Sequence, residues 1–158
     1  MTAPVHVRTQ LREAVVRALK GTRTVDDRVF TGRPYPLTGD ELPGLVVIAE
    51  GEQSEISAIG AEPILGRAIS IAVIGYDEGS DIEDRLDALA VDVEEAIAAD
   101  KTLNPGNPSE RAVAVAMATT LVSTTPAVDG EGAKRVGEIR MVFLAQTRTP
   151  RSQPGIVV

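Results

Sequence analysis

The chain has no cysteine and no tryptophan, and its 158 residues include a single histidine. Without cysteine there is no disulfide framework, no thiolate nucleophile and no cysteine-based zinc site. The histidine, His6, has no second imidazole with which to build a catalytic group or a metal site. We therefore expect no metal and no cofactor, and we expect His6 to be solvated or to cap a helix.

Basic and aromatic residues are also scarce. Sixteen lysines and arginines stand against 23 acidic residues, and the formal charge of -7 has the wrong sign for a surface that displaces phosphate counterions from nucleic acid. With two phenylalanines and two tyrosines, the core must be built from aliphatic side chains. The length is typical of one domain with one core.

Long apolar runs are missing as well. Residues 1–8 carry charge and contain no apolar run of signal-peptide length. No stretch approaches the roughly 18 apolar residues of a membrane span. The sequence therefore predicts a soluble protein that is made in the cytoplasm and has no membrane partner.

Motifs of catalysis are not found. No serine stands in a Gly-x-Ser-x-Gly frame, and the turn at residues 130–135 lacks the spacing and hydroxyl of a phosphate loop. A group of acidic residues near position 80 matches no EF-hand spacing, and a solvated helix start explains it better. Its members are Asp77, Glu78, Asp81, Glu83 and Asp84. We predict no catalytic, cofactor-binding or metal-binding residue and no enzymatic activity.

Two segments have the apolar spacing of an amphipathic helix. In residues 7–20 apolar side chains recur every three or four positions, and Gly21 is a natural stop. A second helix is predicted after Ser80-Asp81-Ile82-Glu83, which fits a capping box. Its predicted buried stripe is Ile82, Leu86, Leu89, Ala90, Val93 and Ile97. Its predicted solvent side carries Glu83, Asp84, Asp87, Asp92, Glu94 and Glu95.

The first half of the chain also contains segments with strand patterns. Alternating or continuous apolar residues, bounded by glycine and proline, indicate strands there. The predicted strands are 24–31, 45–50, 54–59 and 64–76. The second and third of them form a hairpin in this interpretation, with a turn at residues 51–53.

The second half predicts a closing hairpin. Residues 119–125 favour a strand because they are rich in threonine, whereas residues 110–118 stay open between helix and strand. The glycines of Asp129-Gly130-Glu131-Gly132 indicate a turn, beyond which apolar residues alternate through residue 144. These segments form two long antiparallel strands.

Together the elements predict an α+β fold, in which one mainly antiparallel β-sheet packs against two α-helices in a single domain. Residues 1–147 form that domain. Residues 148–158 are basic and rich in proline, so we expect a flexible tail that is disordered or docked on a neighbour.

Several segments carry a resemblance when they are taken in order. They are the helix His6–Leu19, the stretches Val29-Phe30-Thr31-Gly32-Arg33-Pro34 and Leu42-Pro43-Gly44-Leu45-Val46-Val47, the strand ending at Tyr76, the acidic helix after Ser80 and the hairpin around Asp129. This order resembles the tail terminator family of long-tailed bacteriophages, of the lambda minor tail protein U type. The resemblance covers residues 5–147, and residues 103–118 are longer than in the family type.

The resemblance implies a structural protein of the virion. The family forms a homohexameric ring at the head-proximal end of the tail, where it caps the tail tube, stops its polymerisation and presents a surface to the head–tail connector. The expected partners are further copies of the chain, the tail tube protein and the connector protein. Cations near flexible segments of an acidic chain are candidates for these contacts, namely Arg33, Lys134, Arg135 and Arg151.

Two other classes of function stay open. A head–tail connector or head-completion protein is also small, free of cofactors and ring-forming, and it binds portal complexes instead of tail tubes. A small regulatory domain is a monomer that holds a metabolite between the second helix and the sheet.

Overall fold

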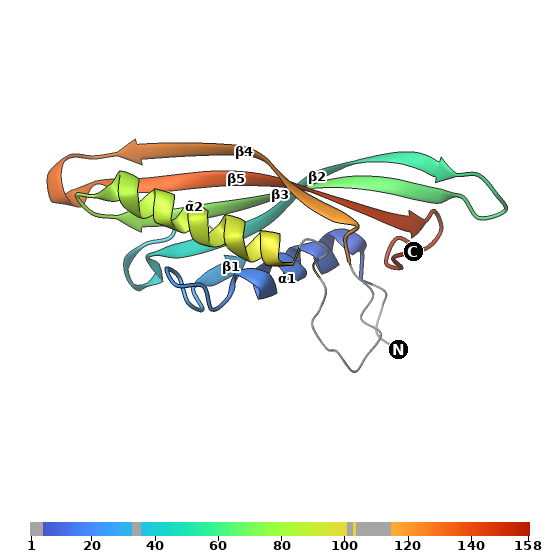
Figure 1. The fold of residues 1–158 in the computed structure, drawn as a ribbon, viewed down its shortest axis with the longest axis horizontal. Coiled ribbons are helices and arrows are strands. Elements are labelled where there is room, and N and C mark those ends of the chain that lie inside the picture. Colours follow the sequence, from blue (N-terminus) through green and yellow to red (C-terminus); the bar gives the residue numbers. More distant parts are fainter. Residues whose placement is uncertain (1–4, 33–35, 101–102, 104–114) are drawn as a thin grey trace.

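The computed structural model describes residues 5–32, 36–100, 103 and 115–158. The elements along the chain are α1 (Val7–Leu19), β1 (Val29–Thr31), β2 (Gly44–Ala58), β3 (Ile64–Glu78), α2 (Ile82–Ala99), β4 (Ala118–Asp129) and β5 (Val136–Pro150) (Figure 1). Single 3-10 turns lie at Gly39–Glu41 and Gly132–Lys134. Among the described helices, none is long and apolar enough to cross a bilayer.

The strands form one elongated sheet in the order β1-β2-β3-β5-β4. The central strands β3 and β5 are 15 residues long and pair over their whole length, from Ile64 opposite Pro150 to Glu78 opposite Val136. All neighbours are antiparallel except the short β1, which runs parallel to β2. The predicted α+β class with one sheet and two helices is therefore broadly confirmed, and the sheet is mixed because β1 is parallel to β2.

The two helices lie along one face of the sheet and cover its core (Figure 1). Side chains alternate along a strand, so every second residue of β3 and β5 points toward the helices. The strand residues of this core include Ile69, Ile71, Val73, Ile139, Met141 and Phe143. The core is mostly aliphatic, as the composition requires.

Among the described residues, no α-helix lies on the opposite face of the sheet. At one end, the loop before β2 covers a smaller apolar cluster around Val46, Ile74 and Tyr76, to which Leu37 contributes. Farther along β5 on the same face, Val142 and Leu144 are only half-buried. The sheet thus has one covered face and one face that is partly open.

The predicted turn at residues 51–53 is wrong, because β2 continues as one strand from Gly44 to Ala58. A bulge between Ala49 and Gly51 takes up the extra residue Glu50, and pairing with β3 resumes beyond it. Glycine marks a bulge as readily as a turn, and the long partner strand decides between them. The first strand is also shorter than predicted, since residues 22–26 form a tight turn closed by a Thr22–Asp26 bridge.

The predicted capping box of α2 is also wrong. Asp81 is the N-cap residue, and its side chain accepts no capping hydrogen bond. The carboxylate of Glu83 binds the Arg135 guanidinium instead, with oxygen–nitrogen distances of 2.6 and 3.0 Å. Glu83, the residue that the capping box would have used, is therefore bound by Arg135 of the β4–β5 hairpin.

Asp92 does not lie on the solvent side of α2, contrary to the prediction. Its side chain is buried and accepts hydrogen bonds from Arg23 and Thr24 in the turn after α1. Helical periodicity alone predicts that Asp92 is exposed to solvent. The polar turn after α1 packs against this part of α2, however, and donates hydrogen bonds to the Asp92 carboxylate.

The last residues differ from the predicted flexible tail. The boundary at residue 147 falls inside β5, which continues through Pro150. Beyond it, the amide of Val158 donates to the Arg148 carbonyl at 3.1 Å, and Val157 packs against the core. Residues 151–158 dock on their own domain. Of the open segment 110–118, residues 110–114 lie outside the described residues, and Ala118 begins β4.

Candidate subunit interface

The two sides of the sheet end in long strands with unpaired backbone. Within the part of the chain that the structure describes, no strand lies beyond β4, and β1 pairs only with Leu45–Val47 of β2. The rest of β2 therefore has a free outer edge, as does β4. Free edges present rows of unpaired N–H and C=O groups that can bind another strand.

The edge strand β4 is unusual because it is uncharged over most of its length. Residues 118–127 contain threonine, serine, alanine, leucine, valine and one proline, but no charged side chain. From residue 122 onward every residue of the strand is exposed, and Val122 is 62% exposed. Soluble proteins normally blunt such edges with charge, so the uncharged edge of β4 is a candidate contact surface.

The other free edge belongs to a projecting hairpin, here called the arm, which consists of residues 51–58 of β2 and residues 64–70 of β3. This hairpin reaches beyond both helices (Figure 1), and its residues from 53 to 62 are all exposed. Ile56 and Ile59 are 61% and 95% exposed. An apolar tip on a projecting hairpin is a typical contact surface.

A buried ion pair stiffens the base of the arm. Arg67 on β3 is 8% exposed; its guanidinium binds Glu52 on β2 and donates to the Thr149 hydroxyl at 2.8 Å. The same Glu52 also accepts from Arg8 on α1 at 2.9 Å. Burial raises the pKa of Glu52, but hydrogen bonds from Ser54 and Arg67 outweigh it and hold that pKa below its usual value. The arm is thereby fixed to the helix layer.

A second ionic cluster fixes α2 to the turn after α1. Asp92 accepts hydrogen bonds from the Thr24 amide at 2.8 Å, the Thr24 hydroxyl at 2.6 Å and the Arg23 guanidinium at 2.7 Å. Burial raises the pKa of Asp92, but these donors hold it below its usual value. Both ionic clusters therefore join elements of the same chain.

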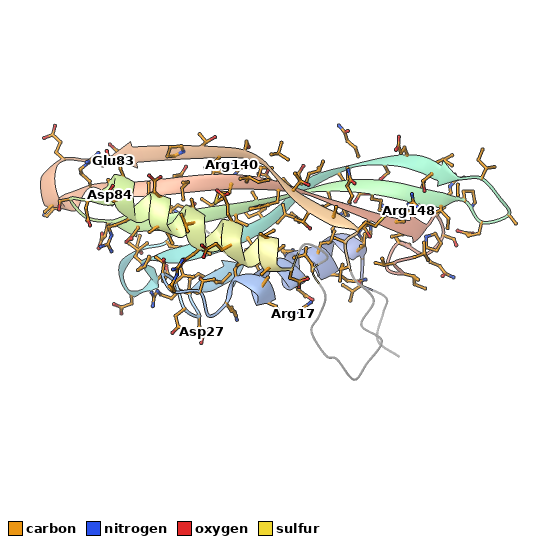
Figure 2. The ribbon with its side chains drawn as sticks, in the orientation of Figure 1. Arg17, Asp27, Glu83, Asp84, Arg140 and Arg148 are labelled. Carbon is orange, nitrogen blue, oxygen red and sulfur yellow. The ribbon has the colours of Figure 1, made fainter. Side chains whose placement is uncertain are left out.

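The residues proposed for partner contacts are not brought together. Arg33 lies outside the described residues. Lys134 and Arg135 lie at the turn of the β4–β5 hairpin, where Lys134 is exposed and Arg135 is held by Glu83, an ion pair that raises the pKa of Arg135. Arg151 follows β5 at the opposite end of the sheet, and its amide donates to the Pro63 carbonyl at 2.9 Å. In Figure 2, Glu83, which binds Arg135, and Arg148, near the end of β5, lie at opposite ends of the sheet.

The histidine caps α1, as predicted. Its Nδ1 accepts from the Arg8 amide at 3.1 Å, and partial burial together with the Arg8 charge lowers the pKa of His6. The acidic group near residue 80 is divided between partners, since Asp77 binds Arg85 at 2.9 Å whereas Glu83 binds Arg135. Among the described residues, no group of three or more His, Cys, Asp or Glu side chains is placed to hold a metal ion.

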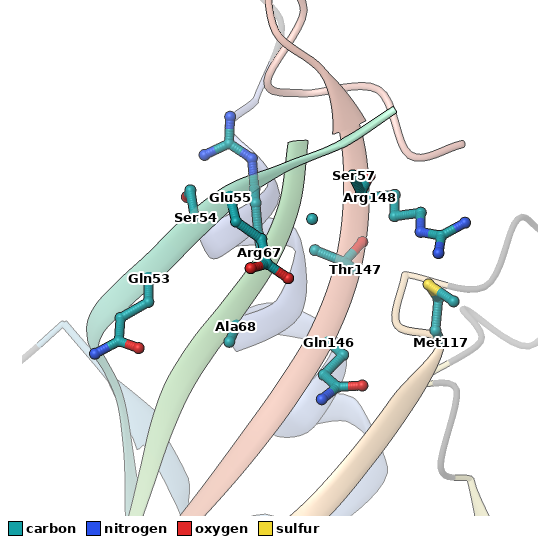
Figure 3. Close-up of a pocket in the computed structure, with 11 residues that line it drawn as sticks. Gln53, Ser54, Glu55, Ser57, Arg67, Ala68, Met117, Gln146, Thr147 and Arg148 are labelled. Atoms are coloured by element: carbon teal, nitrogen blue, oxygen red, sulfur yellow. The ribbon is translucent and has the colours of Figure 1, made fainter. Parts of the chain in front are cut away.

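Two grooves lie on the sheet. The first, of about 410 Å³, lies along the arm (Figure 3), where Gln53 and Glu55 on β2 face Gln146 and Arg148 on β5 across Ala68. The second, of about 360 Å³, lies between the Leu37 loop and the β4–β5 hairpin and is mostly apolar. The first groove mixes opposite charges with amides on an open strand surface, which suits a protein contact better than a small ligand.

Sequence reasoning missed the free edge of β4 as a functional surface. Its signal was present in the uncharged run at residues 118–127, which stands out in a chain of charge -7. The threonines of this run favour a strand over a helix, but they do not show that the strand lies at an edge. Which strand lies at the edge follows from the sheet order, and sequence periodicity does not reveal that order.

No family model matches the sequence, and no curated protein matches it. Among solved structures, a chain of the "Virion of native gene transfer agent (GTA) particle" is similar at 20% identity, over 91% of this chain and 92% of that chain, with a TM-score of 0.45. A TM-score below 0.5 does not establish a common fold.

Proposed function

We propose that this protein is a non-enzymatic structural subunit of a long-tailed phage or phage-like particle, and that it works as a tail terminator. Copies of the chain form a ring, with six as the expected number. The ring caps the finished tail tube, stops its polymerisation and presents its other rim to the head–tail connector. Its place is the head-proximal end of the tail.

The observation that carries the proposal is the pair of free edges on a long sheet. A ring of identical subunits needs two different surfaces that bind one another, because each subunit contacts the next in the same sense. The outer edge of β4 and the outer edge of the arm are two such surfaces on opposite sides of the sheet. In the part of the chain that the structure describes, no strand pairs with these edges.

The order of elements supports the same reading. The sequence resemblance requires a helix, a short strand, a central strand, a long strand ending near Tyr76, an acidic helix and a closing hairpin. The structure has α1, β1, β2, β3, α2 and the β4–β5 hairpin in that order. The acidic surface also suits a ring through which DNA passes, because it repels phosphate.

Tube capping can be tested directly. The purified protein is added to growing tubes of the tail tube protein from the same particle, and tube lengths are measured by electron microscopy. The proposal expects shorter tubes, each with a ring at one end. Tubes of unchanged length without rings contradict the proposal. If the protein instead binds purified portal complexes, viewed by the same electron microscopy, the head–tail connector function is favoured.

A further inference from the structure

We infer that the ring is closed by strand pairing, in which the outer edge of β4 in one subunit pairs antiparallel with residues 51–58 of β2 in the next. This inference rests on the proposed ring and names the surfaces that build it. It makes the sheets of neighbouring subunits continuous.

Strand direction supports this joint. The strands β2, β3, β5 and β4 are each antiparallel to their neighbour, so β2 and β4 run in opposite directions. A neighbouring copy in the same orientation therefore brings its β2 antiparallel to β4. Antiparallel ladders are slightly more stable per residue than parallel ones, and they need no further rearrangement of either edge.

The lengths of the free segments also match. On β2, pairing with β1 occupies Leu45–Val47, and the bulge at Glu50 separates that part from residues 51–58. On β4, Pro126 lacks an amide hydrogen and ends the usable edge, which leaves residues 118–125. The two segments contain the same number of residues, so one ladder can use all of both.

Charge favours this pairing over a pairing of two like edges. The arm carries the exposed Glu55, and two arms side by side would bring these carboxylates together in an already acidic chain. Residues 118–125 carry no charge, so β4 meets the arm without repulsion. The uncharged edge of β4 is therefore suited to pair with the acidic strand of the arm.

The irregularities of both strands fit a curved joint. Register shifts occur between Leu121 and Ser123 on β4 and between Ile56 and Ala58 on β2. Bulges increase local twist and bend a strand, and closing a sheet into a ring requires twist, tilt and a stagger between strands. The bulges therefore lie in the segments that have to bend.

The natural absence of cysteine allows a clean cross-linking test. Gln53 and Glu55 lie on the helix-free face of the arm, and Thr120, Ser123 and Thr125 lie on the same face of β4, as their pairing partners Ala68, Gly66, Leu144, Val142 and Arg140 show. Ser57 has no pairing partner in the register shift, but it lines the groove on the same face together with Gln53 and Glu55. One cysteine is placed at each of the three β2 positions with one at each of the three β4 positions, and the variants are oxidised. Within one subunit the two strands are separated by β3 and β5, roughly 14 Å, which exceeds disulfide reach.

The inference expects disulfide-linked ladders of subunits for the pairs that fit one antiparallel register, and none for a control that combines Gln53→Cys with Val91→Cys on the exposed side of α2. Solution mass is measured on the same reduced samples. A ring-sized mass without any β2–β4 cross-link overturns this joint and leaves the ring intact. A monomer mass without cross-links overturns both the joint and the free ring.

Discussion

Asp92 illustrates, at the scale of single residues, how the acidic side chains of this protein act within the subunit. It lies on the helix whose outer side is otherwise acidic and exposed, yet its carboxylate is buried and surrounded by donors from Arg23 and Thr24. Glu52 has the same position at the base of the arm, between Arg67 and Arg8. These carboxylates fix elements to one another, so they are not available for partners.

Replacing Asp92 with alanine is expected to destabilise the subunit by about 1–3 kcal/mol, because the buried Thr24 amide and hydroxyl lose their acceptor. Urea denaturation followed by circular dichroism measures the loss. The matched control is Glu95→Ala on the same helix, whose carboxylate also binds Arg23 but is exposed. Equal losses for the two variants would show that burial of Asp92 does not matter.

Acid should also weaken the fold through Asp92. Its folded pKa is lowered, so its stabilising contribution is complete above the ordinary pKa of about 4 and is lost as the pH falls through the folded value. Urea midpoints measured from pH 7 down to pH 2.5 should therefore fall steeply below about pH 4. The Asp92→Asn variant should lose less stability over that range than the original protein, and parallel pH profiles would contradict this assignment.

At the scale of helices and strands, the sequence was sufficient to predict some elements but not others. The spacing of apolar residues predicts α1 and most of α2 and β3, because one strong period runs through each of them. It failed at Gly51, where a bulge and a turn have the same local composition and only the length of β3 distinguishes them. It also failed after Thr147, since proline-rich basic residues can dock through backbone hydrogen bonds that composition does not reveal.

The docked end of the chain should contribute to stability. Removing residues 156–158 deletes Val157 from the core surface and the hydrogen bond from Val158 to Arg148. We expect a loss of about 1–2 kcal/mol in urea denaturation. Ile156→Ala, at an exposed residue of the same segment, should change stability by less than about 0.5 kcal/mol. A truncated protein as stable as the original would restore the view of a flexible tail.

The edge of β4 should tolerate positive charge but not negative charge. Ser123→Glu places a carboxylate near the acidic arm of the next subunit, and each like-charge contact costs about 0.2–1 kcal/mol. The concentration needed for assembly should rise several-fold, as measured by sedimentation, whereas Ser123→Lys should assemble at least as well as the original protein. Ala88→Glu on the exposed side of α2 is the control for added charge alone. Equal assembly of all three variants would argue against a joint at β4.

At the scale of the whole molecule, the described residues form a sheet with one covered face, one partly open face and two edges that lack a partner strand. The fold class follows from the sequence, because periodicity and turn residues determine the layers. The proposed interface does not, since it depends on which strands lie outermost. Of the four proposed contact residues, Arg135 is paired internally, and Arg151 lies at the far end from Lys134.

The most direct measurement of the central claim is the mass of the purified protein in solution, by light scattering across a range of concentration and salt. One chain has a mass of 16.6 kDa, and the account predicts a species of about 100 kDa, the mass of a ring of six, that grows with concentration at the expense of the monomer. A constant mass of 16.6 kDa at every concentration, and also in the presence of tail tubes, would contradict it.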